Sequence, residues 1–175
     1  HQVCMGGIKF GPLGIPSNFK EGIAILARPG LGLRHAGIWK LSGGAGLHGD
    51  VMTFQFTEAC FALAASLTIE GKTLYVVNTH LHSVPQMDSS LYHRLEEDLR
   101  AGTISRQELD DAVARWREGL DLQAEQLGEL QKRLGGLPPE VPVILGGDFN
   151  MPPDRDTLAG FRAQNGFSDV CGAAT

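Results

Sequence analysis

The stretch VILGGDFNMP, residues 143–152, decides how the rest of the chain is interpreted. Its apolar run ends at two glycines, and Asp148 and Asn150 follow at once. A short apolar run that is bounded by glycine and proline is typical of a buried strand. Alternate residues of an extended chain point to the same side. We therefore expect Asp148 and Asn150 to converge on one site at the end of this strand.

A second stretch, TLYVVNTHLHS at residues 73–83, has the same pattern. Its apolar run ends in polar and imidazole-bearing residues, which include His80 and His82. A polar turn after a strand is common in proteins without any functional role, so either stretch alone is weak evidence. Two buried strands that both end in reactive side chains predict one shared rim for an active site.

The composition is that of an ordinary globular domain, and we expect residues 1–175 to form a single one. Apolar residues make up 42% of the chain and charged residues 20%, and no run approaches the ~20 apolar residues that a membrane-spanning helix needs. The net charge of −5 argues against a protein that binds nucleic acid through a basic face. Cys4, Cys60 and Cys171 lie outside any CxxC spacing, which argues against structural zinc and a disulfide framework. We expect these cysteines to be buried as small apolar residues.

The first half of the chain predicts strands that are separated by glycine-rich loops. Residues 1–22 are expected to form a loop, and Glu70-Gly71 to form the two-residue turn of a hairpin. The expected strands cover residues 23–27, 33–41, 54–69 and 72–81, and a glycine-rich loop over residues 42–50 carries His48 and Asp50.

Residues 86–137 interrupt this pattern with a helical segment. A first helix is expected over about residues 89–100. Ser105 and Glu108 have the spacing of a capping box, and apolar residues at helical spacing predict a second helix over residues 106–134. We expect this long amphipathic helix to lie on the sheet. The alternative is a surface that contacts a partner or a membrane, and its mixed charges argue against the membrane.

The strand at residues 143–152 is followed by one last helical pattern. Asp156 is expected to cap a short helix that runs to about Gln164, and Gly166 is expected to end it. No internal repeat, low-complexity tract or linker divides the chain.

Two of these motifs together closely resemble the endonuclease/exonuclease/phosphatase superfamily. They are Asn-Thr-His-Leu at residues 78–81 and Gly-Gly-Asp-Phe-Asn at residues 146–150, in this order and with a helix between them. Residues 22–26 are similar to the family's strand G-x-A-I-L-S-R, and residues 169–175 to a segment that is common after its catalytic strand. The resemblance implies an α/β fold, a two-layer β-sandwich flanked by helices (DNase-I-like, four-layer α/β/β/α), with residues 86–137 as a helical insertion.

Within the superfamily, the neutral sphingomyelinase branch is the most similar. The extended Thr-His-Leu-His at residues 79–82 and the His-Gly-Asp loop at residues 48–50 carry this likeness, and residues 148–153 support it. Residues 81–85 are also similar to DNase-I-like sequences, so the substrate class stays open.

The resemblance implies catalytic roles for His80, Asp148 and Asn150. His80 would donate a hydrogen bond to the phosphoryl oxygens and stabilise the charge that grows there. Asp148 would position or deprotonate the attacking water, or contact the metal, and Asn150 would orient that carboxylate and bind a phosphate oxygen. Asp148 and Asn150 supply oxygen ligands, which Mg²⁺ prefers, so the implied cofactor is Mg²⁺ or Mn²⁺. His82 and Asp50 would contact the substrate, and a structural or surface role is the alternative for each.

The function that we expect is metal-dependent hydrolysis of phosphodiester bonds, with a sphingomyelinase-like phospholipid phosphodiesterase preferred. A DNase-I-like nuclease or a phosphatase is the alternative enzyme. An inactive pseudo-enzyme that binds a partner through residues 86–137 is the alternative from another class. The implied partner is a phosphodiester substrate, either a phospholipid head group at a membrane surface or a nucleic acid, and no stretch indicates a stable protein partner.

The chain departs from the family pattern at both ends. The family's metal site also needs an Asn at the end of its first strand and a Glu in a Q-E motif, and its catalytic His follows an Asp in an S-D-H ending. No residue of this chain fills those four roles, and Asp169 stands in the wrong context to be that Asp. Either the 175 residues are the middle part of a longer protein, or the chain is a degenerate module, and we expect the former because the interior motifs are intact.

Overall fold

The computed structural model describes residues 9–10, 13–14, 22–48, 53–57, 60–84 and 89–170. In chain order the elements are β1 (Lys9–Phe10), β2 (Leu13–Gly14), β3 (Arg34–Lys40), β4 (Gly44–His48), β5 (Thr53–Thr57), β6 (Phe61–Ile69), β7 (Lys72–His80), α1 (Ser89–Ala101), α2 (Arg106–Leu134), β8 (Val143–Asp148) and α3 (Asp156–Asn165).

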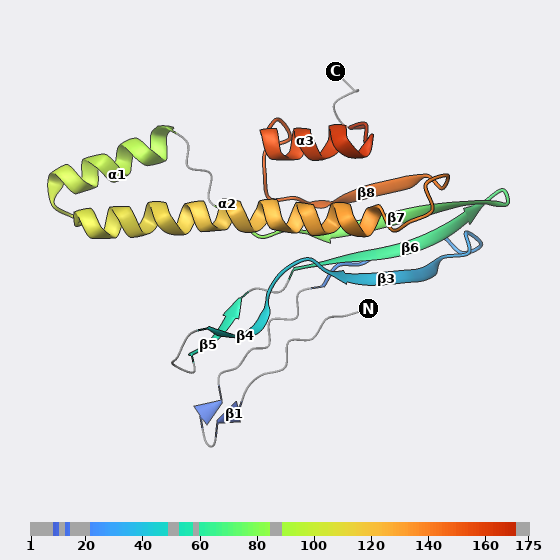
Figure 1. Ribbon diagram of the computed structural model, residues 1–175, viewed down its shortest axis with the longest axis horizontal. Helices are drawn as coiled ribbons and strands as arrows, with labels where there is room; N and C mark the ends of the chain where they lie inside the picture. The colour runs from blue at the N-terminus through green and yellow to red at the C-terminus, as the bar shows by residue number, and fades with distance from the viewer. Residues whose placement is uncertain are drawn as a thin grey trace.

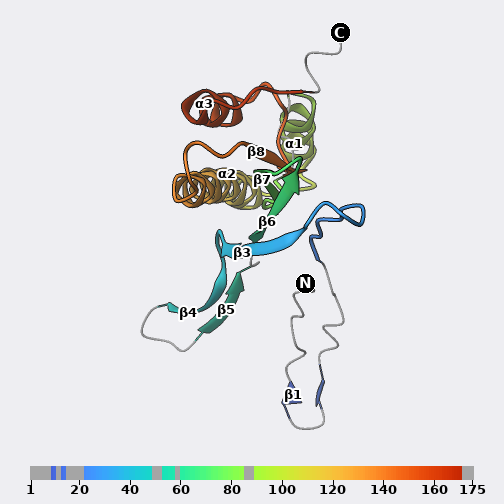
Figure 2. The same ribbon diagram turned by 90° about the vertical axis from the view of Figure 1, so that its right-hand side faces the viewer.

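Four of the strands form a central sheet in the order β3-β6-β7-β8 (Figure 1). β3, β6 and β7 pair antiparallel, whereas β8 pairs parallel with β7. Parallel neighbours need a crossover connection, and here the crossover contains both α1 and α2. β1 pairs with β2 and β4 pairs with β5 in two separate two-stranded sheets, which lie away from the central sheet (Figures 1 and 2).

The predicted hairpin between β6 and β7 is confirmed. Glu70 and Gly71 have φ angles of 50° and 78°, and a type I′ turn requires positive φ at both of its central residues. The turn sets a continuous register in which Ala62 lies opposite Thr79 at the far end of the hairpin. This register fixes where the polar end of β7 lies.

Several other predictions for the first half of the chain are wrong. Residues 22–28 form no strand, and Ala24 instead contacts the sheet through its carbonyl oxygen, which accepts a hydrogen bond from Asn78 Nδ2 at 2.9 Å. The expected strand over residues 54–69 is two strands, β5 and β6. The glycine-rich stretch that was expected as a loop contains β4, and the expected N-terminal loop contains β1 and β2. Pairing between β4 and β5 supplies backbone hydrogen bonds that outweigh the weak strand preference of glycine.

The long helix α2 begins with the predicted capping box. Ser105 Oγ accepts a hydrogen bond from the backbone N–H of Glu108 at 3.2 Å, and Glu108 Oε2 accepts one from the backbone N–H of Ser105 at 2.7 Å. The backbone N–H of Ser105, and after it the Ser105 hydroxyl, hold the pKa of the Glu108 carboxyl below its ordinary value. The box satisfies two of the backbone donors that a helix leaves without a partner at its start.

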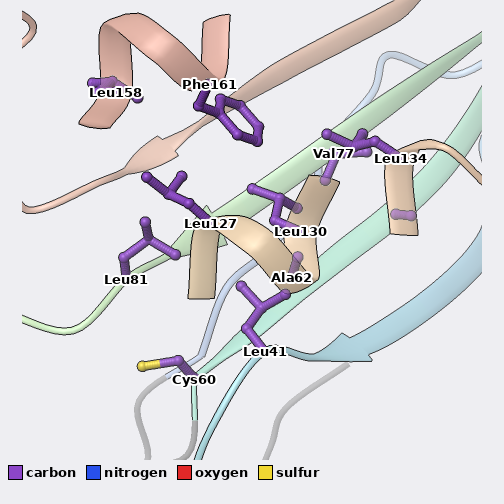
Figure 3. Close-up of a cluster of buried hydrophobic side chains, with 11 residues drawn as sticks. Leu41, Cys60, Ala62, Val77, Leu81, Leu127, Leu130, Leu134, Leu158 and Phe161 are labelled. Carbon is purple, nitrogen blue, oxygen red and sulfur yellow. The ribbon is translucent and has the colours of Figure 1, made fainter. Parts of the chain in front are cut away.

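The apolar face of α2 lies on the sheet, as predicted (Figure 1). Figure 3 shows that leucines of α2 fill the space between the strands and α3. The buried side chains of this core include Ala62 and Val77 from the strands, Leu127, Leu130 and Leu134 from α2, and Leu158 and Phe161 from α3. Cys60 is buried in the same core, as expected, whereas Cys4 and Cys171 lie outside the described residues.

The start of α3 differs from the prediction. Its N-cap is Arg155, which makes no side-chain cap hydrogen bond, and Asp156 is the first helical residue. The carbonyl of Arg155 accepts the first hydrogen bond of the helix, from the backbone N–H of Ala159 at 2.9 Å, so the helix begins one residue too early for Asp156 to be the cap. The negative charge of Asp156 in the first turn still interacts favourably with the positive end of the helix dipole. Gly166 ends the helix with a φ of 68°, as predicted for a left-handed C-cap.

The α/β class is confirmed by the mixed four-stranded sheet and the three helices. The two-layer β-sandwich stays a prediction, because the described residues contain one four-stranded sheet and two small ones. The division into a single domain over residues 1–175 also stays a prediction. Among the described residues, none of the helices combines the length and the apolarity that crossing a membrane requires.

Candidate active site

The polar ends of β7 and β8 lie side by side. The two strands are parallel neighbours, and their register places His80 opposite Asp148. His80 Nε2 lies 3.9 Å from Asp148 Oδ2, and the two side chains are 49% and 64% exposed. The two strand ends therefore share one edge of the sheet, as predicted, whereas an active site at this edge stays a prediction.

The distance between His80 and Asp148 is too long for a hydrogen bond. It is longer than the 2.7–3.2 Å of an N–H···O hydrogen bond, so the two side chains are not hydrogen-bonded to each other. An exposed ion pair contributes only about 0–1 kcal/mol to stability. Stability therefore does not explain why an imidazole and a carboxylate face each other at the open end of the sheet.

Gly147 allows the two strand ends to approach each other. Its φ is 137°, and a Cβ at this position would lie 1.9 Å from the carbonyl oxygen of Thr79 and 2.7 Å from its nitrogen. Glycine alone adopts such a φ readily and adds no side-chain atoms. The second glycine of the GGDFN motif is therefore required by the β7–β8 contact directly before Asp148.

The chain turns sharply at Asn150. β8 ends at Asp148, and Asn150 has a φ of 51°. Its backbone N–H donates to Asp148 Oδ1 at 2.8 Å, which is the hydrogen bond of an Asx turn. The expectation that both side chains point the same way along an extended strand is therefore wrong, because the strand has ended before residue 150.

Asn150 instead joins the two strand ends. Its Nδ2 donates to the carbonyl of Leu81 at 2.7 Å, and the N–H of Leu81 donates to the carbonyl of Asp148 at 2.9 Å. These two hydrogen bonds run in opposite directions between Leu81, directly after β7, and the C-terminal end of β8 with the turn that follows it. With Nδ2 bonded to Leu81, the atom of the Asn150 amide that suits a cation is Oδ1.

The remaining predicted substrate contacts are only partly described. His82 is half-buried, and its backbone N–H and carbonyl bind α2. Asp50 lies outside the described residues, and of His48 only the backbone, in β4, is described. A substrate role for His82 and Asp50 stays a prediction.

A metal ion at this rim stays a prediction. No group of three or more His, Cys, Asp or Glu side chains among them could hold a metal ion together. Asp148 and Asn150 provide a carboxylate and an amide oxygen at one corner, which suit Mg²⁺ in kind. This cation commonly binds one or two carboxylates and keeps several waters, so two protein ligands are compatible with it.

Gln123 and Gln126 are the residues near the site that the sequence interpretation missed. They are 1% and 0% exposed, and both bind the backbone of His82. The signal lies in the pattern of α2, where apolar residues alternate in steps of three and four and Gln123 takes the place between Leu120 and Leu127. A polar residue where the stripe requires an apolar one indicates a buried, hydrogen-bonded side chain.

Comparisons with known proteins find similarity in solved structures. No protein-family model matches the sequence, and no curated protein matches it. The catalytic domain of human Nocturnin with bound sulfate is 16% identical, with a TM-score of 0.42 over 76% of this chain and 36% of that one. Sphingomyelinase C from Streptomyces griseocarneus is 16% identical, with a TM-score of 0.38 over 65% of this chain and 30% of that one. A β toxin from Staphylococcus aureus is 16% identical, with a TM-score of 0.40 over 62% of this chain and 30% of that one.

The chain thus spans about a third of the length of the structures to which it is similar. At these TM-scores the similarity assigns no family, and the function is inferred from the chain's own residues.

Proposed function

We propose that this chain carries the catalytic rim of a metal-dependent phosphodiesterase. The observation that supports the proposal is the register of β7 and β8, which places His80 opposite Asp148 at the open ends of two parallel strands. In open α/β sheets, ligands bind beyond the carboxyl ends of the strands. The motifs around both residues resemble those of the endonuclease/exonuclease/phosphatase superfamily, whose members hydrolyse phosphate esters.

Each of the three residues has a role that its position permits. His80, with a proton on Nε2, donates a hydrogen bond to a phosphoryl oxygen and stabilises negative charge in the transition state. Asp148 Oδ2 orients the attacking water or removes its proton. Asp148 Oδ1 accepts the Asn150 N–H at 2.8 Å, so Asn150 orients the carboxylate through its backbone. The phosphate contact expected from Asn150 would need Nδ2, which here donates to Leu81.

Asp148 and Asn150 are also the residues that would hold Mg²⁺ or Mn²⁺, through their side-chain oxygens. Such a cation, when bound, neutralises phosphate charge and polarises a water molecule. The remaining ligands would come from water, from the substrate phosphate and from residues outside the described part of the chain.

Among phosphodiesters, we propose a phospholipid head group as the substrate. The Thr-His-Leu-His motif at residues 79–82 supports this choice, with His82 and Asp50 as head-group contacts. The net charge of −5 also supports it, because a zwitterionic head group is repelled less by an acidic protein than the dense negative charge of DNA. Such a substrate brings the rim to a membrane surface.

The rival functions make different predictions. A nuclease would cleave DNA with a steep salt dependence, and a phosphatase would prefer phosphomonoesters. A binding module would hydrolyse none of these substrates. The proposed phosphodiesterase implies the two-layer β-sandwich, since the phosphoesterases that it resembles have this fold.

The test is a substrate panel for the full-length protein. Turnover is measured on sphingomyelin vesicles, on duplex DNA and on p-nitrophenyl phosphate, each with Mg²⁺ and with excess EDTA. We expect head-group release from sphingomyelin that EDTA abolishes and Mg²⁺ restores. Cleavage of DNA alone would assign a nuclease, and turnover of p-nitrophenyl phosphate alone a phosphatase. A folded protein that turns over nothing would overturn the proposal in favour of a binding module.

A further inference from the structure

Gln123 and Gln126 of α2 form a buried polar pair (the glutamine pair) on a helix face that is otherwise lined by leucine. They are 1% and 0% exposed, and the neighbouring Leu127 and Leu130 are 3% and 0% exposed. A buried amide destabilises a protein unless hydrogen bonds replace the lost water. The partners of these two side chains therefore explain why glutamine stands at these positions.

The glutamine pair binds both backbone groups of His82. Gln126 Oε1 accepts the His82 N–H at 2.8 Å, and Gln123 Nε2 donates to the His82 carbonyl at 2.7 Å. Residues three apart lie next to each other on a helix surface, so the two amides can reach one residue of the loop after β7 (residues 81–84). They bind its backbone N–H and its carbonyl, as a neighbouring strand would in a sheet. This residue is the second one beyond His80.

Gln123 also reaches the loop after β8 (residues 149–155). Its Nε2 donates to the carbonyl of Asn150 at 3.0 Å, and Arg155 Nη1 lies 3.5 Å from its Oε1. The two protons on Nε2 thus match two carbonyl oxygens, one in each loop. One buried amide joins the residue two positions beyond His80 to the residue two positions beyond Asp148.

Further contacts hold α2 against the same region. Gln126 Nε2 donates to Ser42 Oγ at 2.6 Å, which ties the helix to the chain just beyond β3. Gly119 lies so close to the loop after β7 that a Cβ there would be 2.9 Å from Val84 Cγ2. The helix is therefore held in place on both sides of Gln123, so the hydrogen bonds of Gln123 can hold the two loops in a defined position.

We propose that Gln123 is a positioning residue for the hydrolytic site: its amide sets the loop after β7 relative to the loop after β8 and so fixes His80 relative to Asp148. This inference rests on the proposed function. It also makes α2 part of the site, rather than a separate surface for a partner. Reacting groups must be held closely, because a misplacement of about 1 Å lowers the rate roughly 100-fold.

The test replaces Gln123 in the full-length protein by methionine, which is unbranched, of similar length, and unable to bond to either carbonyl. The matched control is Gln131→Met on the same helix, where Gln131 Nε2 instead donates to Gln164 Oε1 of α3 at 3.4 Å. We expect the kcat of Gln123→Met on sphingomyelin to fall roughly 10- to 100-fold with KM changed by less than about threefold. The kcat of Gln131→Met is expected to equal that of wild type.

A second readout does not depend on activity. The Cε1–H resonance of His80 is followed by NMR, with His93 as an internal reference because it pairs with Glu97 at 3.3 Å on α1. We expect the His80 signal to shift or broaden in Gln123→Met and the His93 signal to stay in place. A residue with only a structural role would leave the His80 signal of the folded protein unchanged.

The outcomes separate this inference from the proposed function. If wild type hydrolyses none of the substrates, the proposed function fails, and the His80 signal alone decides whether Gln123 positions this residue. If wild type is active, both the fall in kcat and the change at His80 are required, and the absence of either overturns the inference. If Gln123→Met does not fold, the same measurements are made on Gln123→Glu. This variant keeps the shape of the side chain and the Oε1 atom that faces Arg155 Nη1. Failure of both variants to fold assigns Gln123 to the fold and overturns the inference.

Discussion

Gly147→Ala tests the close approach of β7 and β8 that builds the rim. The new Cβ would lie 1.9 Å from the Thr79 carbonyl oxygen, about 1 Å short of the 3.0 Å that real Cβ atoms keep. The obstacle is backbone, so no side-chain rotation relieves it. A side chain at a φ of 137° costs about 1–3 kcal/mol, and overpacking costs about 1–3 kcal/mol more. We expect a loss of about 2–6 kcal/mol, against a total of about 5–15 kcal/mol for a typical domain.

Gly146→Ala is the matched control for this substitution. A Cβ at Gly146 meets nothing within 4 Å, and its φ is not in the left-handed region. Unfolding by urea, followed by circular dichroism, gives the stability of both variants and of wild type. We expect Gly146→Ala to be as stable as wild type or more stable by up to about 1 kcal/mol, because alanine loses less backbone freedom than glycine within a strand. Equal stability of the two variants would refute the conclusion that the β7–β8 contact requires glycine at 147.

Three further predictions concern α2. Leu130 is 0% exposed in the core, so Leu130→Ala is expected to lower the free energy of unfolding by about 2–5 kcal/mol. A Cβ at Gly128 meets open space, so Gly128→Ala is expected to raise the free energy of unfolding by about 0.5–1 kcal/mol. Urea titration measures both, and a loss below about 1 kcal/mol for Leu130→Ala would contradict the burial of this side chain in the core. The capping-box hydrogen bonds of Glu108 lower the pKa of its carboxyl. The carboxylate therefore stabilises the folded state at pH values above the ordinary pKa of 4.5, and this stabilisation is lost as the pH falls through the lowered pKa. Glu108→Gln should therefore be less stable than wild type at pH 7 and approach it in acid, and a stability difference that does not change with pH would contradict this assignment.

The parts of the fold with strong local patterns could be predicted from the sequence. α2 was expected over residues 106–134 and has these bounds, because a capping box and a long apolar stripe both act within one segment. The Glu70-Gly71 hairpin and β8 were also predicted, because a turn dipeptide and a short apolar run are likewise patterns within one segment. That the ends of β7 and β8 lie side by side was predicted from their similar sequences, whereas the parallel register that places His80 opposite Asp148 was not predicted.

The features that could not be predicted depend on contacts between distant residues. The Asn78 side chain binds the carbonyl of Ala24 across 54 residues, and the expected strand around Ala24 does not form. The glutamine pair binds His82 across 41 and 44 residues, so its partners cannot be read from α2 alone. The turn at Asn150 requires knowledge of where β8 ends, since the alternation of side chains holds only within the strand.

The most direct test of the proposed site is the kcat of Asp148→Asn in the full-length protein, on the substrate that the panel identifies. The substitution keeps the shape of the side chain and removes the carboxylate that faces His80. Asp110→Asn is the control, because Asp110 is an exposed acid on α2 and neutralising it makes the same change in net charge. We predict that Asp148→Asn lowers kcat roughly 10²- to 10⁴-fold, as expected for loss of a general base, while Asp110→Asn matches wild type. Wild-type turnover by a folded Asp148→Asn variant would contradict the assignment of this rim as the active site.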